Sequence, residues 1–410
     1  MLGSFPITSV SWSELFPFSF LFISIPFSFL SFSLFLFFVI LLYLILLSRF
    51  LFMKRHACIA NIEKLPEFDD HKLVSFFADR KTGLRAFVAI HNDNLGPATG
   101  GTRMWAYATE ADALCDVLNL SRAMTYKCAL AGVHYGGGKG VIIGNSETMK
   151  TPALLFAYAG LLYSGFKDIF STGTDVGLTD DDVKIMSAAN PHIIGVLHGD
   201  KLSTSDMATL GVFSSILGVF EEAYRDHDLS GKTFAVKGLG KTGMELVRFL
   251  TEAGAHVVAA EINKKKVALA RKQFPTLRVV SPAIIHKQKV DVYCPCALGG
   301  DITSKTVREL RCRFIVGSAN NQLASTIVGA TLHKKGILYV PDYVANAGGL
   351  INVVDELEKG GYRSDRVLTR VKNIKRTIRK IIARSQKEKQ PTNLIADRMA
   401  EEIFSKKRRT

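Results

Sequence analysis

The sequence predicts an α/β protein made of two domains separated by a cleft. A chain of 410 residues is long enough for two domains with full hydrophobic cores. Residues 232–237 form an apolar run typical of a buried strand, the glycine-rich turn 238–243 follows, and residues 244–253 have the apolar spacing of an amphipathic helix. A strand, a G-x-G-x-x-G turn and a helix in this order indicate a Rossmann-type dinucleotide-binding domain. The preceding residues alternate between strand and helix patterns, which favours a second α/β domain for the substrate.

Four segments follow from these patterns. We expect a hydrophobic extension, a substrate and catalytic domain, the dinucleotide-binding domain, and a C-terminal helical segment that returns to the substrate domain and ends in a basic tail. Their predicted bounds are residues 1–52, 53–205, 206–344 and 345–410.

The extension has two explanations that the sequence leaves open. Residues 27–47 carry no charge and are long enough to cross a bilayer as a helix of about twenty residues. Basic residues follow this run and none precedes it, so an inserted helix would leave the rest of the chain in the cytoplasm. The alternative is a mis-assigned translation start, because Met53 begins a stretch that reads as a complete soluble protein. Both explanations predict a cytoplasmic location for the catalytic part.

Charge and cysteine usage restrict the classes of partner. Residues 363–410 hold 16 Lys or Arg and 5 Asp or Glu, which is 16 − 5 = 11 of the net charge of +15. Such a run could bind nucleic acid or an anionic membrane, but it is more often the solvated face of a helix. We therefore expect no nucleic-acid partner. The six cysteines contain no C-x-x-C pair, which favours reduced thiols, and we expect no metal site.

Two lysines stand in a segment of small residues at 124–140. Lys127 lies near the end of a predicted helix at 110–128, and Lys139 follows three consecutive glycines. A lysine among Gly, Ala and Val is expected to be partly desolvated, which lowers its pKa and lets it act as a base. The alternative is a glycine turn that carries an exposed lysine. Asp175 follows a predicted strand at 168–171 and adds a carboxylate at a strand end.

The dinucleotide unit has the spacing that the fold requires. Gly238, Gly240 and Gly243 would let a pyrophosphate approach the N-terminus of the following helix. Glu261 ends the next strand, where a carboxylate binds ribose hydroxyls, so NAD is favoured over NADP. The lysines at 264–266 weaken this preference, and the alternative for Glu261 is a surface acid. Further residues at predicted strand ends are candidates for cofactor binding, namely Cys296, Ala297, Asn320 and Asn321.

Several motifs together resemble one enzyme family. They are MTYKCALAGVHYGGGKGVIIG, GPATGGTRM, TDVG, the G-x-G-x-x-G unit, PCALGG, ANNQL and PDYVANAGGLINV. Together they resemble the glutamate/leucine/phenylalanine/valine dehydrogenases, most closely the leucine and phenylalanine branch. The resemblance covers residues 65–405 and nothing in 1–52. It implies NAD-dependent, reversible oxidative deamination of an apolar L-amino acid, a dimerisation-type substrate domain, and a homo-oligomer between dimer and octamer.

The resemblance also implies roles for individual residues. Lys127 would pair with the substrate carboxylate, with Asn346 and the backbone at Gly100 and Gly101 beside it. Lys139 would activate water against the iminium, and Asp175 would move a proton to and from the amine. A second cation at Lys127 is expected to favour the neutral form of Lys139.

The substrate side chain would contact an apolar pocket. Glutamate-specific members have lysine and serine where this chain has Thr99 and Val353, so a γ-carboxylate would lack a partner. We expect the pocket to consist of Met124, Thr99, Gly173, Leu350 and Val353. Gly173 with Leu350 resembles phenylalanine-type members, although a pocket methyl changes preference by only ~1–3 kcal/mol.

Three residues depart from the family pattern. Thr174 replaces an acid, Ala208 replaces a threonine that contacts nicotinamide, with Thr209 one place away, and Thr99 is polar where leucine-type members are apolar. A second hypothesis is therefore a catalytically weakened member that acts as a membrane-tethered NAD or amino-acid binding protein.

Overall fold

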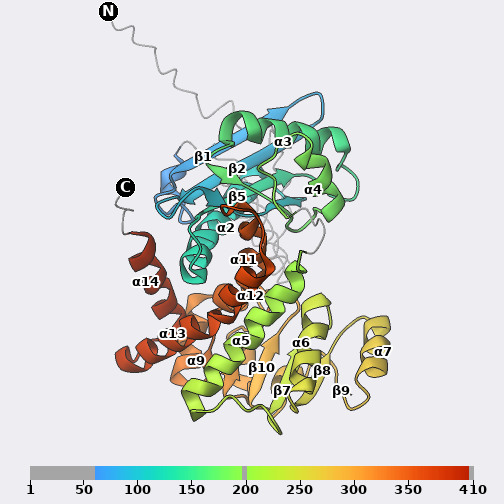
Figure 1. Cartoon of the computed structure of the whole chain (residues 1–410), viewed down its shortest axis with the longest axis vertical. Coiled ribbons are helices and arrows are strands. Elements are labelled where there is room, and N and C mark those ends of the chain that lie inside the picture. The colour runs from blue at the N-terminus through green and yellow to red at the C-terminus, as the bar shows by residue number, and fades with distance from the viewer. Residues whose placement is uncertain (1–60, 196–200, 406–410) are drawn as a thin grey trace, which may run out of the picture. The chain divides into compact units, whose positions relative to one another are not determined.

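The computed structural model describes residues 61–195 and 201–405. These residues form two lobes, each built around its own six-stranded sheet (Figure 1). The predicted hydrophobic extension lies outside the described residues, so neither explanation for it is tested. Within the described ranges, every helix is too short or too polar to cross a bilayer.

The first lobe is a mixed sheet in the order β1-β2-β5-β3-β6, with β4 paired to β5. β1 and β2, and β2 and β5, are antiparallel, whereas β3, β4 and β6 run parallel to their partners. α3 and α4 cover one face and α2 covers the other (Figure 1). The bounds are η3 (Ile62–Lys64), β1 (Leu73–Asp79), β2 (Leu84–Asn92), β3 (Ala98–Thr99), β4 (Thr102–Trp105), α2 (Glu110–Ala131), β5 (Gly136–Ile143), α3 (Pro152–Phe166), β6 (Phe170–Ser171) and α4 (Asp180–Ser187).

The triple glycine is part of a strand and not of the glycine turn that the sequence offered as an alternative. β5 begins at Gly136 and pairs with β2, β3 and β4. A Cβ atom on Gly137 would lie 2.1 Å from the Thr125 nitrogen, and one on Gly138 would lie 2.8 Å from the Phe170 ring. Glycine normally weakens a strand, but here neighbouring atoms occupy the space of any side chain.

The second lobe is a parallel sheet in the order β12-β11-β10-β7-β8-β9. α5, α6 and α7 pack on one face, and α8 and α9 pack on the other. The order places the first strand in the middle, which confirms the predicted doubly wound sheet. The bounds are α5 (Thr204–Tyr224), β7 (Thr233–Lys237), α6 (Lys241–Glu252), β8 (His256–Ala260), α7 (Lys264–Gln273), β9 (Arg278–Val279), η4 (Ile285–Lys287), β10 (Val292–Pro295), α8 (Thr306–Glu309), β11 (Phe314–Ile315), α9 (Thr326–Lys334) and β12 (Leu338–Tyr339).

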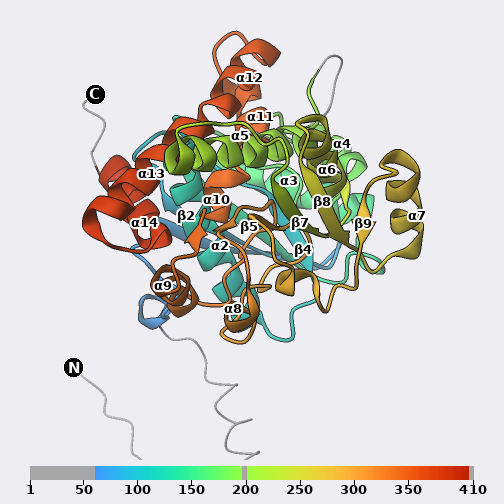
Figure 2. The same cartoon turned by 90° about the horizontal axis from the view of Figure 1, so that it is seen from below.

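The C-terminal helices contact both lobes. α13 packs along α5, and α14 packs on α2 of the first lobe (Figure 2). Their buried isoleucines join the core of the second lobe. The bounds are α10 (Asp342–Ala345), α11 (Gly348–Val354), η5 (Asp355–Leu357), α12 (Ser364–Lys372), α13 (Ile374–Glu388) and α14 (Thr392–Phe404).

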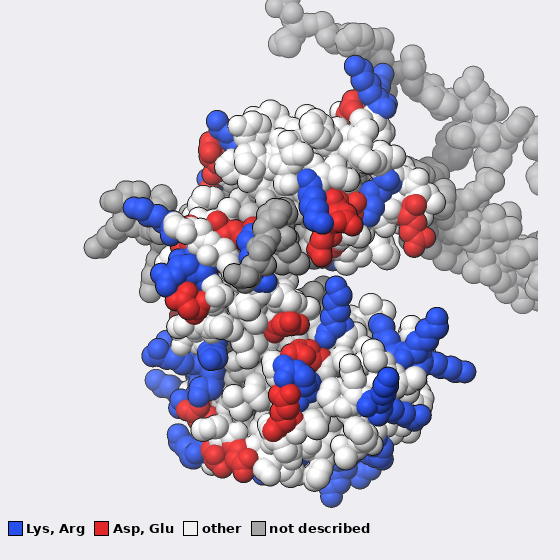
Figure 3. All heavy atoms as spheres, turned by 45° about the vertical axis from the view of Figure 1, so that its right-hand side comes forward, with Lys and Arg blue, Asp and Glu red and all other residues white. Residues whose placement is uncertain are grey.

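Several basic residues of this region are paired with acids. Lys375 and Arg379 bind Glu221 of α5 at 2.8 and 2.6 Å, and Arg384 binds Glu402 at 2.6 Å. On the face shown in Figure 3, acidic side chains also lie among the lysines and arginines of both lobes. Pairing of this kind leaves less free positive charge for an anionic polymer than the residue count suggests.

A buried histidine stabilises the contact between β2 and α2. His91 lies within hydrogen-bond distance of Thr125 Oγ1 (2.9 Å) and Asp69 Oδ2 (3.3 Å), with the ring of His71 beside it. Arg122 donates to the same Asp69 carboxylate at 2.6 Å. Burial lowers the pKa of His91 to about 4, and the neighbouring His71 adds to this shift while Asp69 opposes it.

This shift predicts a loss of stability in acid. Because the native pKa lies below the value of about 6.5 in an unfolded chain, the unfolded state takes up the proton first as the pH falls. The free energy of unfolding should decrease between pH 6.5 and 4, by up to about 3 kcal/mol from His91. Denaturant unfolding of the wild type and of His91→Gln at pH 7, 6 and 5 measures this effect. The difference between the two curves should shrink towards pH 5, and parallel curves would refute the assignment.

Candidate active site

Lys139 and Asp175 form an ion pair in the first lobe. β5 carries Lys139, and Asp175 follows β6 after Gly173. The Lys139 Nζ atom lies 2.6 Å from Asp175 Oδ2, and only 6% of Lys139 is exposed. The alternative of a turn with an exposed lysine is therefore wrong. A buried amine and a carboxylate in contact can exchange protons with a substrate placed between them.

Arg103 is a second cation beside Asp175. Its Nε atom donates to Asp175 Oδ2 at 3.2 Å, and its Nη1 atom donates to Asp116 at 2.9 Å. Burial alone would raise the pKa of Asp175, but the charges of Lys139 and Arg103 outweigh burial and hold this pKa below its ordinary value. Asp175 is therefore a carboxylate at neutral pH.

Lys127 and Asn346 join the two lobes. Lys127 lies one turn before the end of α2, and its Nζ donates to Asn346 Oδ1 at 2.6 Å. The Asn346 amide nitrogen donates to Asn320 Oδ1 at 2.7 Å and to the Ser318 carbonyl at 3.1 Å, both at the end of β11. Burial lowers the pKa of Lys127 to about 8, and Asp342 opposes this shift. One amide thus connects a lysine of the first lobe to the strand edge of the second.

The glycine turn after β7 has room for an anion. Gly238 has φ +98°, which favours glycine, and a Cβ on Gly243 would lie 1.9 Å from the Gly238 carbonyl oxygen. Gly240 is the N-cap of α6, makes no side-chain cap, and has open space where a Cβ would be. The free N–H groups of the first helical turn therefore face an accessible surface, which suits a dinucleotide pyrophosphate.

Glu261 lies beside this turn at the end of β8. Its carboxylate accepts hydrogen bonds from the backbone N–H groups of Leu239 (2.8 Å), Ile262 (2.8 Å) and Asn263 (2.9 Å). Burial alone would raise the pKa of Glu261, but these N–H groups outweigh it and keep the pKa below the ordinary value. The carboxylate is thus fixed in position, as a group that binds ribose hydroxyls should be. The residues present fit NAD.

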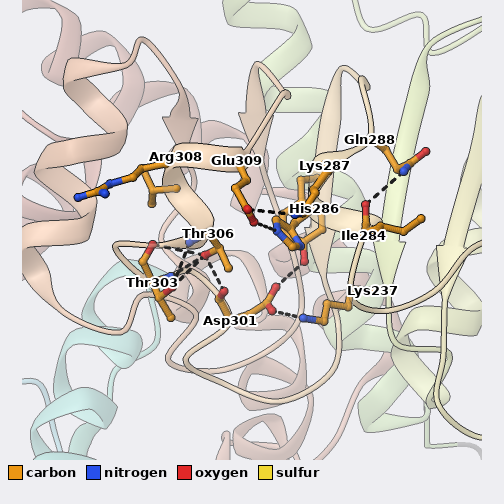
Figure 4. Close-up of polar contacts among 12 residues, drawn as sticks. Lys237, Ile284, His286, Lys287, Gln288, Asp301, Thr303, Thr306, Arg308 and Glu309 are labelled. Atoms are coloured by element: carbon orange, nitrogen blue, oxygen red, sulfur yellow. Dashed lines mark hydrogen bonds and ion pairs between the residues drawn. The ribbon is translucent and has the colours of Figure 1, made fainter.

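An ion pair anchors the loop after β10, next to the glycine turn. Asp301 binds Lys237, the last residue of β7 (Figure 4), and also accepts a hydrogen bond from the Tyr293 hydroxyl. Ala297 of the same loop lies against Gly238, because a Cβ on that glycine would be 2.9 Å from Ala297. The loop that carries Cys296 and Ala297 is therefore fixed to two strands of the sheet.

Two family models match the chain. The Glu/Leu/Phe/Val dehydrogenase dimerisation domain matches residues 71–190, and the Glutamate/Leucine/Phenylalanine/Valine dehydrogenase model matches residues 260–405. The leucine dehydrogenase of Bacillus subtilis (strain 168) is 40% identical over 349 residues, which cover 85% of this chain and 95% of the relative. The chain belongs to the Glu/Leu/Phe/Val dehydrogenase family.

Other relatives agree with this assignment. The phenylalanine dehydrogenase of Thermoactinomyces intermedius is 40% identical over 339 residues, covering 82% of this chain and 92% of the relative. The crystal structure of L-tryptophan dehydrogenase from Nostoc punctiforme has a TM-score of 0.73 and 39% identity, and covers 83% of this chain and 97% of that one. This Glu/Leu/Phe/Val dehydrogenase is an NAD-dependent amino-acid dehydrogenase, as predicted. The hypothesis of a membrane-tethered binding protein has no support from these comparisons.

Packing accounts for Gly173 and places Met124 beside Gly100 in this Glu/Leu/Phe/Val dehydrogenase. The missing side chain of Gly173 does not open space for a ring, because a Cβ there would lie 2.5 Å from the Ile194 carbonyl oxygen. Met124 lies close to Gly100, whose Cβ would be 3.1 Å from the Met124 side chain. The structure thus attributes Gly173 to close backbone packing. The substrate contacts of all five predicted pocket residues, Thr99, Met124, Gly173, Leu350 and Val353, stay predictions.

Gly100 and Gly101 are also required by the fold of this dehydrogenase. A Cβ on Gly100 would lie 1.9 Å from the Gly138 carbonyl oxygen, and one on Gly101 would lie 2.5 Å from the Thr174 carbonyl oxygen. These contacts hold the segment after β3 against β5 and the Asp175 loop. Their predicted contact with substrate is not tested by this packing.

Sequence reasoning missed three charged residues of this dehydrogenase site. Arg103 contacts Asp175, Asp301 anchors the loop after β10, and buried Asp342 accepts a 2.7 Å hydrogen bond from the Gln322 backbone nitrogen near Lys127. Each stands within or beside a glycine-rich motif, which could have drawn attention to the residue but not to its distant contact partner. No group of His, Cys, Asp or Glu in the described ranges has the arrangement of a metal site.

Proposed function

We propose that this enzyme catalyses the reversible oxidative deamination of an apolar or aromatic L-amino acid. The amino acid, water and NAD⁺ would give the 2-oxo acid, ammonium, NADH and a proton. The observation that carries the proposal is the buried contact of Lys139 with Asp175, with Lys127 and Asn346 at the junction of the lobes. An amine and a carboxylate in contact, beside a second amine, supply both the proton transfer and the carboxylate binding that this reaction needs.

Each side chain has a defined task in the proposal. Lys127 binds the substrate carboxylate, and Asn346 orients Lys127 through its 2.6 Å contact. Asp175 accepts a proton from the substrate ammonium before oxidation, since its lowered pKa keeps it ionised. NAD, held at the glycine turn by Gly238, Gly240, Gly243 and Glu261, would supply the hydride acceptor for the α-carbon. Lys139 then removes a proton from water as the water attacks the iminium carbon, which gives a carbinolamine. Asp175 returns its proton to the nitrogen, and the C–N bond breaks as the hydroxyl proton passes to Asp175, which leaves the 2-oxo acid and ammonia. The protons left on Lys139 and Asp175 supply the ammonium and the released proton of the overall reaction.

The substrate class follows from the pocket and from the relatives. The predicted pocket residues Thr99, Met124, Leu350 and Val353 include no cation that could pair with a γ-carboxylate. Relatives named for leucine, phenylalanine, valine and tryptophan fit an apolar or aromatic side chain. We further propose a homo-oligomer between dimer and octamer, supported by the dimerisation-domain match. The cytoplasmic location stays a prediction.

A substrate screen tests this function. NADH formation by the full-length protein at alkaline pH should be measured with Leu, Val, Ile, Phe, Trp and Glu. Burying an unpaired γ-carboxylate costs several kcal/mol, so kcat/KM for the best apolar substrate should exceed that for Glu by at least about 100-fold. A preference for Glu, or no NADH with any of the six, would contradict the proposal.

A further inference from the structure

Thr99 lies on the sheet face that carries Lys139. β3 runs parallel to β5, with Ala98 beside Gly136 and Thr99 beside Gly137. The Ala98 side chain faces the core under α3. Its Cβ atom lies 3.2 Å from the place that a Cβ on Gly138 would occupy. Successive side chains of a strand point to opposite faces, so Thr99 points to the α2 face, as Lys139 does.

The hydroxyl of Thr99 has no internal partner. The residue is 1% exposed, and its Oγ1 atom makes no hydrogen bond to any described residue. Thr102, three residues further along the chain, is equally buried, but its hydroxyl contacts Tyr158 at 2.9 Å and Thr172 at 2.8 Å. A buried hydroxyl without a partner destabilises a protein, and valine has the same shape without that cost. A ligand that forms the missing hydrogen bond would explain why position 99 is threonine and not valine.

We propose that Thr99 selects an aromatic L-amino acid whose ring carries a hydrogen-bond donor. This proposal rests on the proposed function and specifies its substrate. An ionised side chain is disfavoured because the predicted pocket offers no counter-charge, and Met124, Leu350 and Val353 suit a large apolar surface. Two side chains combine a large aromatic ring with one polar atom that donates a hydrogen bond. They are tryptophan, through its indole N–H, and tyrosine, through its phenol O–H.

Paired substrates that differ only in the donor test this inference. For the full-length protein, kcat/KM should be measured for Trp against 3-benzothienyl-alanine, in which sulfur replaces the indole N–H, and for Tyr against Phe. The same ratios are measured in Thr99→Val, which removes only the hydroxyl, and in Thr99→Ser, which keeps it. The wild type should favour the donor-bearing member of one pair by about fivefold or more, Thr99→Val should bring that ratio close to one, and Thr99→Ser should retain it.

Unfolding provides a readout that does not depend on turnover. Without substrate, Thr99→Val should raise the midpoint of thermal unfolding, because it removes a buried hydroxyl without a partner. The matched control Thr102→Val should lower the midpoint, since that hydroxyl is bonded.

The outcomes separate the two proposals. A donor preference for Trp that Thr99→Val removes supports the inference with indole as the donor, and the same result for Tyr supports it with phenol. Ratios that are equal in the wild type and in Thr99→Val overturn the inference, while turnover of Leu or Phe leaves the proposed function standing. Failure to oxidise any amino acid overturns both.

Discussion

Lys139→Met should lower kcat by about 10³-fold, because general acid–base catalysis by one positioned group contributes 10²–10⁴-fold. Methionine keeps the length of the side chain and removes the amine that contacts Asp175. Arg103 remains beside the carboxylate, so Asp175 keeps a partner and the first lobe should still fold. Initial rates of NADH formation with the best amino acid, at saturating NAD, measure the effect.

The control for this prediction is a lysine elsewhere in the same lobe. Lys184→Met removes an exposed ion pair with Asp181 and should leave kcat within about twofold. NADH binding followed by fluorescence should be unchanged in both variants, since neither residue lies at the glycine turn. Turnover of Lys139→Met within tenfold of the wild type would exclude Lys139 as the base.

Gly243→Ala should weaken NAD binding by about 10- to 100-fold, because overpacking typically costs 1–3 kcal/mol. The added Cβ would lie 1.9 Å from the Gly238 carbonyl oxygen, so the turn between β7 and α6 must distort. The same distortion should lower the midpoint of thermal unfolding. Titration with NADH and a thermal melt measure the two effects.

Alanine variants of two other glycines serve as controls for this experiment. A Cβ on Gly240 meets nothing within 4 Å, so Gly240→Ala should keep the unfolding midpoint and weaken NAD binding only if the pyrophosphate approaches that backbone. Gly160 in α3 also has open space at its Cβ position and is far from the turn in sequence. Gly160→Ala should therefore lower neither the unfolding midpoint nor the NAD affinity. Equal NAD affinity in Gly243→Ala and the wild type would show that the turn does not hold the cofactor.

The sequence predicts those features that depend on a few adjacent residues. The strand, glycine turn and helix around Gly243 agree with the structure, because local backbone chemistry specifies them. The parallel sheet follows from the same local units. Such features are visible without knowledge of distant contacts.

Features that depend on contacts between distant segments could not be predicted. Glycines 136–138 read as a loop, since only the positions of Thr125 and Phe170 show that side chains are excluded from a strand there. The sequence places Gly173 in the expected pocket, but only the structure shows that the nearby Ile194 carbonyl excludes a side chain at this position. Arg103 lies 72 positions before Asp175, and no spacing rule connects the two.

The glycine strand also limits how this enzyme can evolve. Thr125, Phe170 and Tyr158 lie where side chains of Gly137, Gly138 and Gly140 would be, on either side of Lys139 in the chain. A side chain at any of these three positions therefore requires Thr125, Phe170 or Tyr158 to move. Substitutions among the predicted pocket residues can change the preferred amino acid. The backbone of β5 that carries Lys139 is much less free to change.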